Sequence, residues 1–198
     1  MEHLNDTLFL LINAPQHPAA WTLFLARLLA RYVIWAYPLI LALCWLRGGE
    51  QIRRAALEAA LAGILGLLIS GLIGLAWQHP RPFVMGLGHV FLHHAADSSF
   101  PSDHLTFIWA VSFALMFHAA SRRLGLVLAI VGLPVAWSRI YLGVHFPLDM
   151  VGAAVVAGLA AWLCARARHP FVDVVFGWAV CLYRFLFAAL IRRGWLRP

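Results

Sequence analysis

The sequence predicts an all-α integral membrane protein, a bundle of five to six transmembrane helices preceded by a helix at the membrane interface. Of its 198 residues 63% are hydrophobic and 12% are charged, and the mean hydropathy is +0.83. A soluble fold of this length lacks the interior volume to bury so much apolar surface, so lipid must solvate much of it. This composition excludes the soluble, disordered and fibrous classes. No linker or repeat divides the chain, so we expect one domain over residues 1–198.

The expected elements follow one another along the chain. Residues 4–14 are short and mixed in polarity, which favours an interfacial helix over a cleaved signal. Five apolar segments come next, and each is long enough, or nearly so, to cross a bilayer, which needs about 20 helical residues. They lie at residues 21–46, 55–77, 105–120, 124–140 and 147–165. Residues 171–191 are apolar but contain Asp173 and Arg184. We interpret this last segment as a cytoplasmic interfacial helix, with a sixth crossing as the alternative.

The basic residues predict the orientation of these spans. All 15 are arginine, and the loops after the first, third and fifth spans hold Arg47, Arg53, Arg54, Arg122, Arg123, Arg166 and Arg168. Because cytoplasmic loops of membrane proteins are enriched in Lys and Arg, these loops are predicted to be cytoplasmic. The pI near 10.4 then reflects topology and anionic lipid headgroups, so the expected partner is the lipid bilayer and not nucleic acid.

Three polar clusters fall on the opposite, external side, at residues 79–83, 101–104 and 138–149. Arg81 and Arg139 supply forked cations suited to a phosphoryl group. Ser102 stands at a helix start, where its hydroxyl and the backbone N–H of Asp103 add donors at the positive end of the helix. A helix cap alone explains Ser102 if the motif is taken by itself. Convergence of three clusters on one face instead favours an active site.

Two histidines of these clusters stand at positions suited to phosphoryl chemistry. His145 precedes Asp149 by four residues, with Pro147 suited to the first helical turn, so the carboxylate can orient the imidazole. An imidazole oriented in this way is a phosphorus nucleophile. His104, at another helix start, can protonate the leaving oxygen and afterwards activate water.

Together these motifs resemble the three-part signature of the type-2 phosphatidic acid phosphatase superfamily, written K-x6-R-P, P-S-G-H and S-R-x5-H-x3-D. Within it, Asp103 and the run from residue 138 to residue 149 resemble the bacterial undecaprenyl-diphosphate phosphatases linked to bacitracin resistance. The resemblance covers about residues 20–165. It implies a helical-bundle phosphatase in the bacterial inner membrane, with its site facing the periplasm, a polyprenyl diphosphate substrate and no metal or other cofactor.

The resemblance also assigns roles to residues of this chain. It implies that His145 is the nucleophile, that Asp149 orients it, and that His104 is the general acid and then the base. Phosphate binding falls to Arg81, Ser102 and Arg139, with the backbone of Asp103.

The chain departs from the signature at two positions. Where the pattern has lysine, seven residues before Arg81, this chain has Gly74. His79 or His89, which we place at the entrance of the site, can substitute for that lysine, or Arg81 and Arg139 suffice. Asp103 replaces a glycine, and beside an anionic substrate its carboxylate should point away or pair with a cation.

Alternatives to this interpretation remain at the site and for the function. His89, His93, His94 and Asp97 form a set that can bind metal, although lining the entrance fits a metal-independent mechanism better. The same motifs also serve a phosphatase for phosphatidylglycerophosphate or phosphatidate, or a lipid phosphotransferase, because they recognise phosphate and not the tail. A small transporter or scaffold accounts for the spans but leaves the external clusters unexplained. The sequence predicts no oligomeric state.

Overall fold

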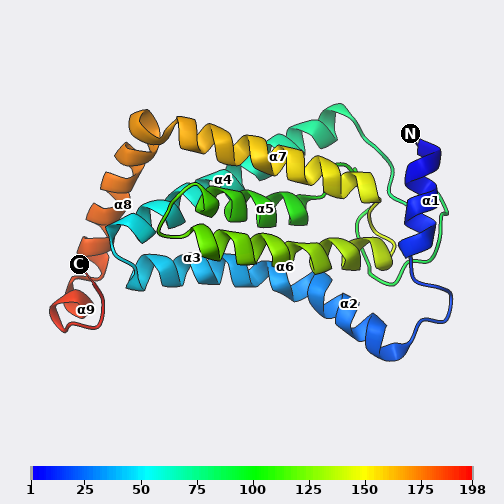
Figure 1. The fold of residues 1–198 in the computed structure, drawn as a ribbon, viewed down its shortest axis with the longest axis horizontal. Coiled ribbons are helices and arrows are strands. Elements are labelled where there is room, and N and C mark those ends of the chain that lie inside the picture. Colours follow the sequence, from blue (N-terminus) through cyan, green and yellow to red (C-terminus); the bar gives the residue numbers. More distant parts are fainter. Residues whose placement is uncertain (1, 198) are drawn as a thin grey trace.

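The protein is a bundle of helices packed side by side, seen here in a computed structural model that describes residues 2–197 (Figure 1). The predicted fold class is confirmed, and no strand occurs among these residues. In chain order the elements are α1 (Glu2–Ile12), α2 (Ala20–Tyr32), η1 (Val33–Trp35), α3 (Ala36–Arg47), α4 (Glu50–Ala76), α5 (Asp103–Met116), α6 (Arg122–Tyr141), α7 (Pro147–Arg166), η2 (Arg168–Val172), α8 (Asp173–Leu186) and α9 (Ala188–Arg192).

The first predicted span is interrupted, which the sequence analysis did not anticipate. Pro38 has no N–H, so the carbonyl of Ile34 loses its helical partner four residues on. The N–H of Ala36 bonds instead to the carbonyls of Ile34 and Val33, which closes the tighter turn of η1. Figure 1 shows the consequence, because α2 leans away from the bundle while α3 lies along it. The combined segment of 28 residues is still long and apolar enough to cross a membrane.

The third predicted span is shorter than expected. Helix α5 ends at Met116, four residues before the predicted end, and its 14 residues extend about 21 Å at about 1.5 Å per residue. The hydrocarbon core of a bilayer is about 30 Å thick. Helix α5 is the central helix, packed against α4, α6 and α7, so neighbouring helices and not lipid surround most of its length. Among the described residues the four helical segments that meet the length and apolarity needed to cross a membrane are the α2–α3 segment, α4, α6 and α7.

Small residues on α4 let α5 approach closely. A Cβ added at Gly66 would lie 3.1 Å from Cγ2 of Thr106 and 3.4 Å from Cβ of Ala110. Ser70, one turn further along α4, donates a hydrogen bond of 2.6 Å to Oδ1 of Asp103 at the start of α5. The strip of small residues therefore holds α5 against α4 and fixes the position at which α5 begins.

Helices α1 and α8 run across the two opposite ends of the bundle (Figure 1). Helix α8 ends at Leu186 and is followed by the short α9, and Asp173 in its first turn forms an ion pair with Arg54 of α4. The guanidinium of Arg53 lies 4.6 Å from the ring centroid of Tyr183. A transverse helix tied to arginines in this way has the geometry of a helix lying at a membrane surface. That residues 171–191 stay on this surface is still a prediction.

Candidate active site

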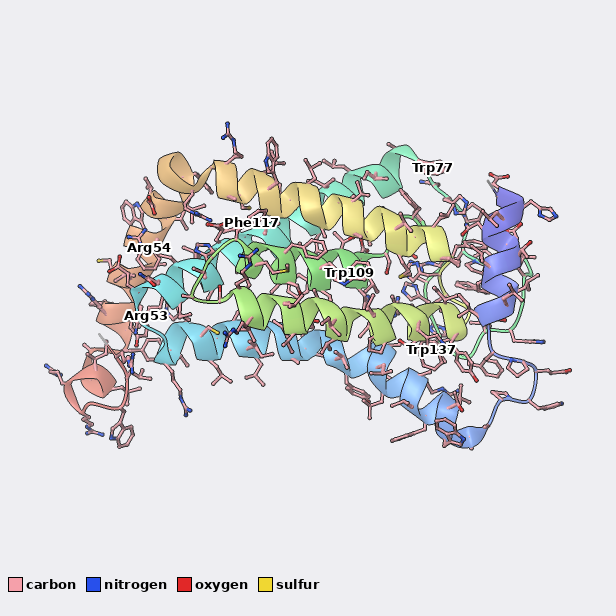
Figure 2. All side chains as sticks on the ribbon, viewed as in Figure 1. Arg53, Arg54, Trp77, Trp109, Phe117 and Trp137 are labelled. Atoms are coloured by element: carbon pink, nitrogen blue, oxygen red, sulfur yellow. The ribbon has the colours of Figure 1, made fainter. Side chains whose placement is uncertain are left out.

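The three polar clusters meet at one end of the bundle. The loop of residues 77–102 after α4, the start of α5, the end of α6 and the start of α7 all reach this end, where α1 lies across them (Figure 1). In Figure 2 the labelled side chains of Trp77 and Trp137 lie toward this end, whereas Arg53 and Arg54 lie at the other. The arginine-rich loops and the clustered polar groups therefore occupy opposite ends of the molecule.

A glycine turn sets the direction of the segment that carries His145. Helix α6 ends at Tyr141, and Gly143 adopts a φ of +82°, a backbone conformation that side chains disfavour. A Cβ at Gly143 would lie 2.2 Å from the carbonyl oxygen of His89. The turn is closed by hydrogen bonds from Gly143 N to Ile140 O (3.0 Å) and from Val144 N to Arg139 O (3.2 Å). The chain consequently reverses and directs His145 inward, and His145 is only 1% exposed.

The start of α7 fixes the orientation of the His145 ring. Pro147 begins the helix and Asp149 occupies its third position, from which Oδ2 accepts the backbone N–H of Phe146 at 2.8 Å. The same oxygen lies 3.1 Å from Nδ1 of His145. Oδ2 already accepts the Phe146 N–H, and the guanidinium of Arg81, 3.0 Å from Nε2, can only donate, so Nδ1 carries the hydrogen and Nε2 keeps its lone pair. This is the tautomer that a nucleophilic imidazole needs.

Ser99 is a site residue that the sequence analysis missed. It is fully buried, and its Oγ donates to Oδ2 of Asp149 at 2.5 Å. Its Oγ also lies 3.5 Å from Nδ1 of His145. The run Ser98-Ser99 before the recognised motif gave no periodic or spacing signal, because the contact joins residues 50 positions apart.

Two arginines face Nε2 of His145. Nη1 of Arg81 lies 3.0 Å from Nε2, and Nη2 of Arg139 lies 3.4 Å from it. Arg81 also donates to the backbone carbonyls of Val144 (2.9 Å) and Ser98 (3.1 Å), which hold its guanidinium in place. Both arginines are buried, at 3% and 2% exposure. Two forked cations therefore converge on the atom that would attack phosphorus.

Several donors in this region have no partner among the described residues. Oγ of Ser102 and Nε of Arg139 are buried and make no hydrogen bond. Ser102 stands at the N-cap of α5 without capping it, so the cap explanation for this residue is wrong. Unpaired buried donors cost free energy, and an anion bound between these groups would satisfy them. The residues present therefore fit a phosphoryl group.

The carboxylate of Asp103 is turned toward α4. Its Oδ1 accepts the hydroxyl of Ser70, which agrees with the expectation that an acid beside an anion site points elsewhere. The backbone N–H of Ser102 donates to the carbonyl of Asp149 at 3.3 Å. This bond joins the starts of α5 and α7, so the two halves of the site are fixed relative to each other.

Electrostatics keep the proposed nucleophile neutral. Burial is the largest effect and lowers the pKa of His145 well below its usual range, and the positive charges of Arg139 and Arg81 lower it further. An imidazole with a depressed pKa retains its lone pair at neutral and mildly acidic pH. The environment therefore favours a nucleophile over an imidazolium.

The remaining histidines lie at different distances from this centre. His104, in the first turn of α5, is half-buried and interacts electrostatically with Arg139, His94 and Arg81. His79 contacts the rings of Trp77 and Phe146 at 5.5 Å and 5.6 Å and lines a cleft of about 500 Å³.

His89 is exposed, and its backbone is held by the side chain of Asn13. The ring of His94 lies 6.1 Å from that of His145, so His94, which was expected to line the entrance, reaches the centre of the site. Within the described part of the chain, no group of three acidic, histidine or cysteine side chains is arranged to hold a metal ion.

Comparison with known proteins identifies the family of this chain. Residues 55–169 match the family model of the PAP2 superfamily. The chain belongs to the PAP2 superfamily. This PAP2 match includes every predicted catalytic and phosphate-binding residue, and it confirms the resemblance drawn from the motifs.

Individual PAP2 relatives extend the likeness over most of the chain. YbjG of Escherichia coli strain K12 is 41% identical over 203 aligned positions, which cover 100% of this chain and 99% of YbjG. Undecaprenyl-diphosphatase BcrC of Bacillus subtilis strain 168 is 45% identical over 150 positions, covering 74% of this chain and 77% of BcrC. The crystal structure of Aquifex aeolicus LpxE superposes with a TM-score of 0.64 at 25% identity, covering 82% of this chain and 95% of that one. The chain is thus a multi-pass membrane protein of this superfamily.

Proposed function

We propose that this protein removes the terminal phosphate of undecaprenyl diphosphate, giving undecaprenyl phosphate and inorganic phosphate, through a phosphohistidine on His145. The observation that carries the proposal is the orientation of His145, with Nδ1 held by Asp149 and Nε2 turned toward two buried arginines. The named activity of BcrC, at 45% identity, supports the choice of substrate.

The proposed reaction has two steps, each an in-line displacement. Nε2 of His145 attacks the terminal phosphorus, and the bond from phosphorus to the bridging oxygen breaks as His104 gives that oxygen a proton. Water then attacks the phosphohistidine, and His104 takes a proton from the water. Inorganic phosphate leaves and His145 regains its lone pair. Arg81 and Arg139 stabilise the charge on the phosphoryl oxygens in both steps.

The leaving group carries the lipid chain, so the chain should leave the site beside the general acid. An apolar groove of about 300 Å³ reaches His104 from the lipid-facing side, lined by Ile34, Trp35, Pro38, Leu67 and Phe107. This groove lies at the break between α2 and α3. It suits an isoprenoid chain that enters sideways from the bilayer. We expect Leu67→Trp to slow hydrolysis of the long-chain substrate more than that of a short-chain diphosphate such as farnesyl diphosphate.

We place the site at the periplasmic face of the bacterial inner membrane. The loops rich in arginine lie at the end of the bundle opposite the site, and the positive-inside rule assigns such loops to the cytoplasm. In this orientation the reaction recycles a lipid carrier of cell-wall synthesis and supports resistance to bacitracin. Accessibility of single cysteines placed in the 77–102 loop to an impermeant thiol reagent tests the orientation.

A substrate panel on purified protein in detergent tests the activity. Phosphate release from undecaprenyl diphosphate, phosphatidylglycerophosphate and phosphatidate is measured with EDTA present, for the wild type and His145→Ala. We expect the highest kcat/KM for the diphosphate and no turnover by His145→Ala. Retained activity in His145→Ala removes this residue from the nucleophile role, and preference for a monophosphate rejects the proposed substrate.

A further inference from the structure

We propose that His94 is a third phosphate-binding side chain of this site, which becomes a donor to the substrate's diphosphate when that substrate arrives. The inference rests on the proposed phosphatase function and deepens it. It concerns a residue that neither the motifs nor the comparisons assign.

The ring of His94 lies beside the ring of His145, the proposed nucleophile. The loop of residues 77–102 carries it to the site, where its side chain is only 21% exposed and its ring meets that of His145 edge to face, with centroids 6.1 Å apart. Nδ1 of His94 lies 3.7 Å from Oδ1 of Asp97, and that same oxygen accepts Nε of Arg81 at 2.8 Å. The shared carboxylate oxygen of Asp97 therefore holds Arg81 and His94 close to each other beside His145, and leaves Nε2 of His94 outside this contact.

The hydrogen-bonding state of the ring identifies the atom that would bind phosphate. Nδ1 lies 3.2 Å from the carbonyl oxygen of Ala95, and a carbonyl only accepts, so Nδ1 carries a hydrogen. In the neutral ring Nε2 is then an acceptor and repels a phosphate oxygen. Protonation of Nε2 converts it into a charged donor.

The charges around His94 couple that protonation to substrate binding. Burial lowers the pKa of His94, and the facing cations Arg81 and Arg139 lower it further, while Ala95 and Asp97 oppose them. His94 in turn interacts electrostatically with His104 and His145. In the free site these effects favour the neutral ring. A bound diphosphate places several negative charges among the same groups, reverses the local field and favours the protonated ring.

The other candidates for this role have different surroundings. The ring of His79 faces Trp77 and Phe146, and His89 is exposed, with its ring near Phe91. His93, next to His94 in the same loop, is also exposed. His94 is thus the loop histidine whose neighbours are the two arginines and the catalytic pair.

The test compares three variants of the full chain in detergent: His94→Ala, His94→Lys and, as the matched control, His93→Ala. KM and kcat for undecaprenyl diphosphate are measured from pH 5.5 to 8.5. We expect His94→Ala to raise KM at pH 6 by about tenfold or more, the effect of losing one charged hydrogen bond. The wild-type KM should rise with pH as His94 loses its proton, His94→Lys should flatten that rise because lysine stays charged, and His93→Ala should match the wild type.

Two results overturn the proposal. One is a KM for His94→Ala equal to that of His93→Ala at every pH, and the other is a wild-type pH dependence retained in His94→Lys. Binding of inorganic sulfate, a dianion throughout this range, is measured by calorimetry on the same proteins. If the wild type hydrolyses no undecaprenyl diphosphate, the proposed function fails, while weaker sulfate binding by His94→Ala than by His93→Ala still supports the role of His94. Equal sulfate binding by the two variants counts against it.

Discussion

Removal of the Ser99 hydroxyl should slow the chemical step without weakening substrate binding. Oδ2 of Asp149 accepts three hydrogen bonds, from Ser99 Oγ at 2.5 Å, Phe146 N at 2.8 Å and His145 Nδ1 at 3.1 Å. Ser99→Ala removes the shortest of these from a fully buried group. The carboxylate is then held by one structural donor instead of two, and the His145 ring gains freedom to turn.

The size of the effect follows from the charge on the acceptor. A hydrogen bond to a charged group contributes about 1.5–3 kcal/mol, and about 1.4 kcal/mol is tenfold in rate. Because Phe146 N still holds Asp149, we expect the lower end of the range, a loss of about tenfold in kcat. KM should change little, since Ser99 contacts neither arginine. A merely structural role would lower stability and the amount of active protein but leave kcat per active site unchanged.

The neighbouring serine provides the control. Oγ of Ser98 donates to the backbone carbonyls of Trp77 and Phe100 at 3.2 Å and 3.3 Å, and the bond from Arg81 goes to its main-chain oxygen. Ser98→Ala therefore keeps every contact to the site. Steady-state kinetics of both variants, with active sites counted by trapping of the phosphoenzyme, decide the matter. Equal kcat values for the two variants would refute the reasoning.

Three further predictions concern stability, turnover and pH. Glu58 is fully buried and binds Arg168 at 2.7 and 2.9 Å, far from the site. Glu58→Gln should therefore lower the melting temperature through a loss of about 1–3 kcal/mol of folding free energy, discounted for the exposure of Arg168, with unchanged kcat. A fall in kcat would contradict this prediction. Gly143→Ala forces a Cβ into contact at a backbone φ of +82°. The substitution should lower kcat more than 10-fold, because about 1–3 kcal/mol of strain displaces the loop that carries His145. A wild-type kcat in this variant would reject the role of the glycine turn. The folded state lowers the pKa of His145, so below the ordinary histidine pKa of about 6.5 the unfolded chain binds more protons than the folded one. The melting temperature should therefore fall as the pH drops below that value, and less steeply in His145→Gln than in the wild type. Parallel curves of melting temperature against pH for the two proteins would disprove the assignment.

Composition and spacing predicted most of the fold, because the bilayer imposes strong constraints on length and polarity. The span at 147–165 is α7 almost to the residue, since lipid requires a long apolar run. The same rule failed at α5, whose length is flanked by neighbouring helices and not by lipid. It also gave no sign of η1, where one proline locally overrides an apolar segment.

Some contacts of the site join residues close in sequence and could be predicted, whereas others join residues that only the folded chain brings together. The His145–Asp149 pair was predictable because both residues lie within one turn of the start of α7. Ser99 and His94 come from a loop without secondary structure, and their contacts to α7 and to the 142–146 loop span about 50 residues. No spacing rule connects such residues, whereas the unpaired hydroxyl of Ser102 becomes informative only when burial is known.

In the proposed mechanism, the contacts of Arg81 link substrate binding to activation of the nucleophile. Its Nη1 lies 3.0 Å from Nε2 of His145, in the space where an attacked phosphorus must come to about the same distance. The guanidinium therefore covers the lone pair in the free site. A phosphoryl group offers Arg81 an anionic acceptor in place of a neutral imidazole nitrogen, which adds the attraction between opposite charges. The bonds from Nη2 to the Ser98 carbonyl and from Nε to Asp97 can hold the arginine while Nη1 turns from nitrogen to phosphate. In the proposed mechanism the same exchange would bind the substrate and uncover Nε2 of His145, the proposed attacking atom.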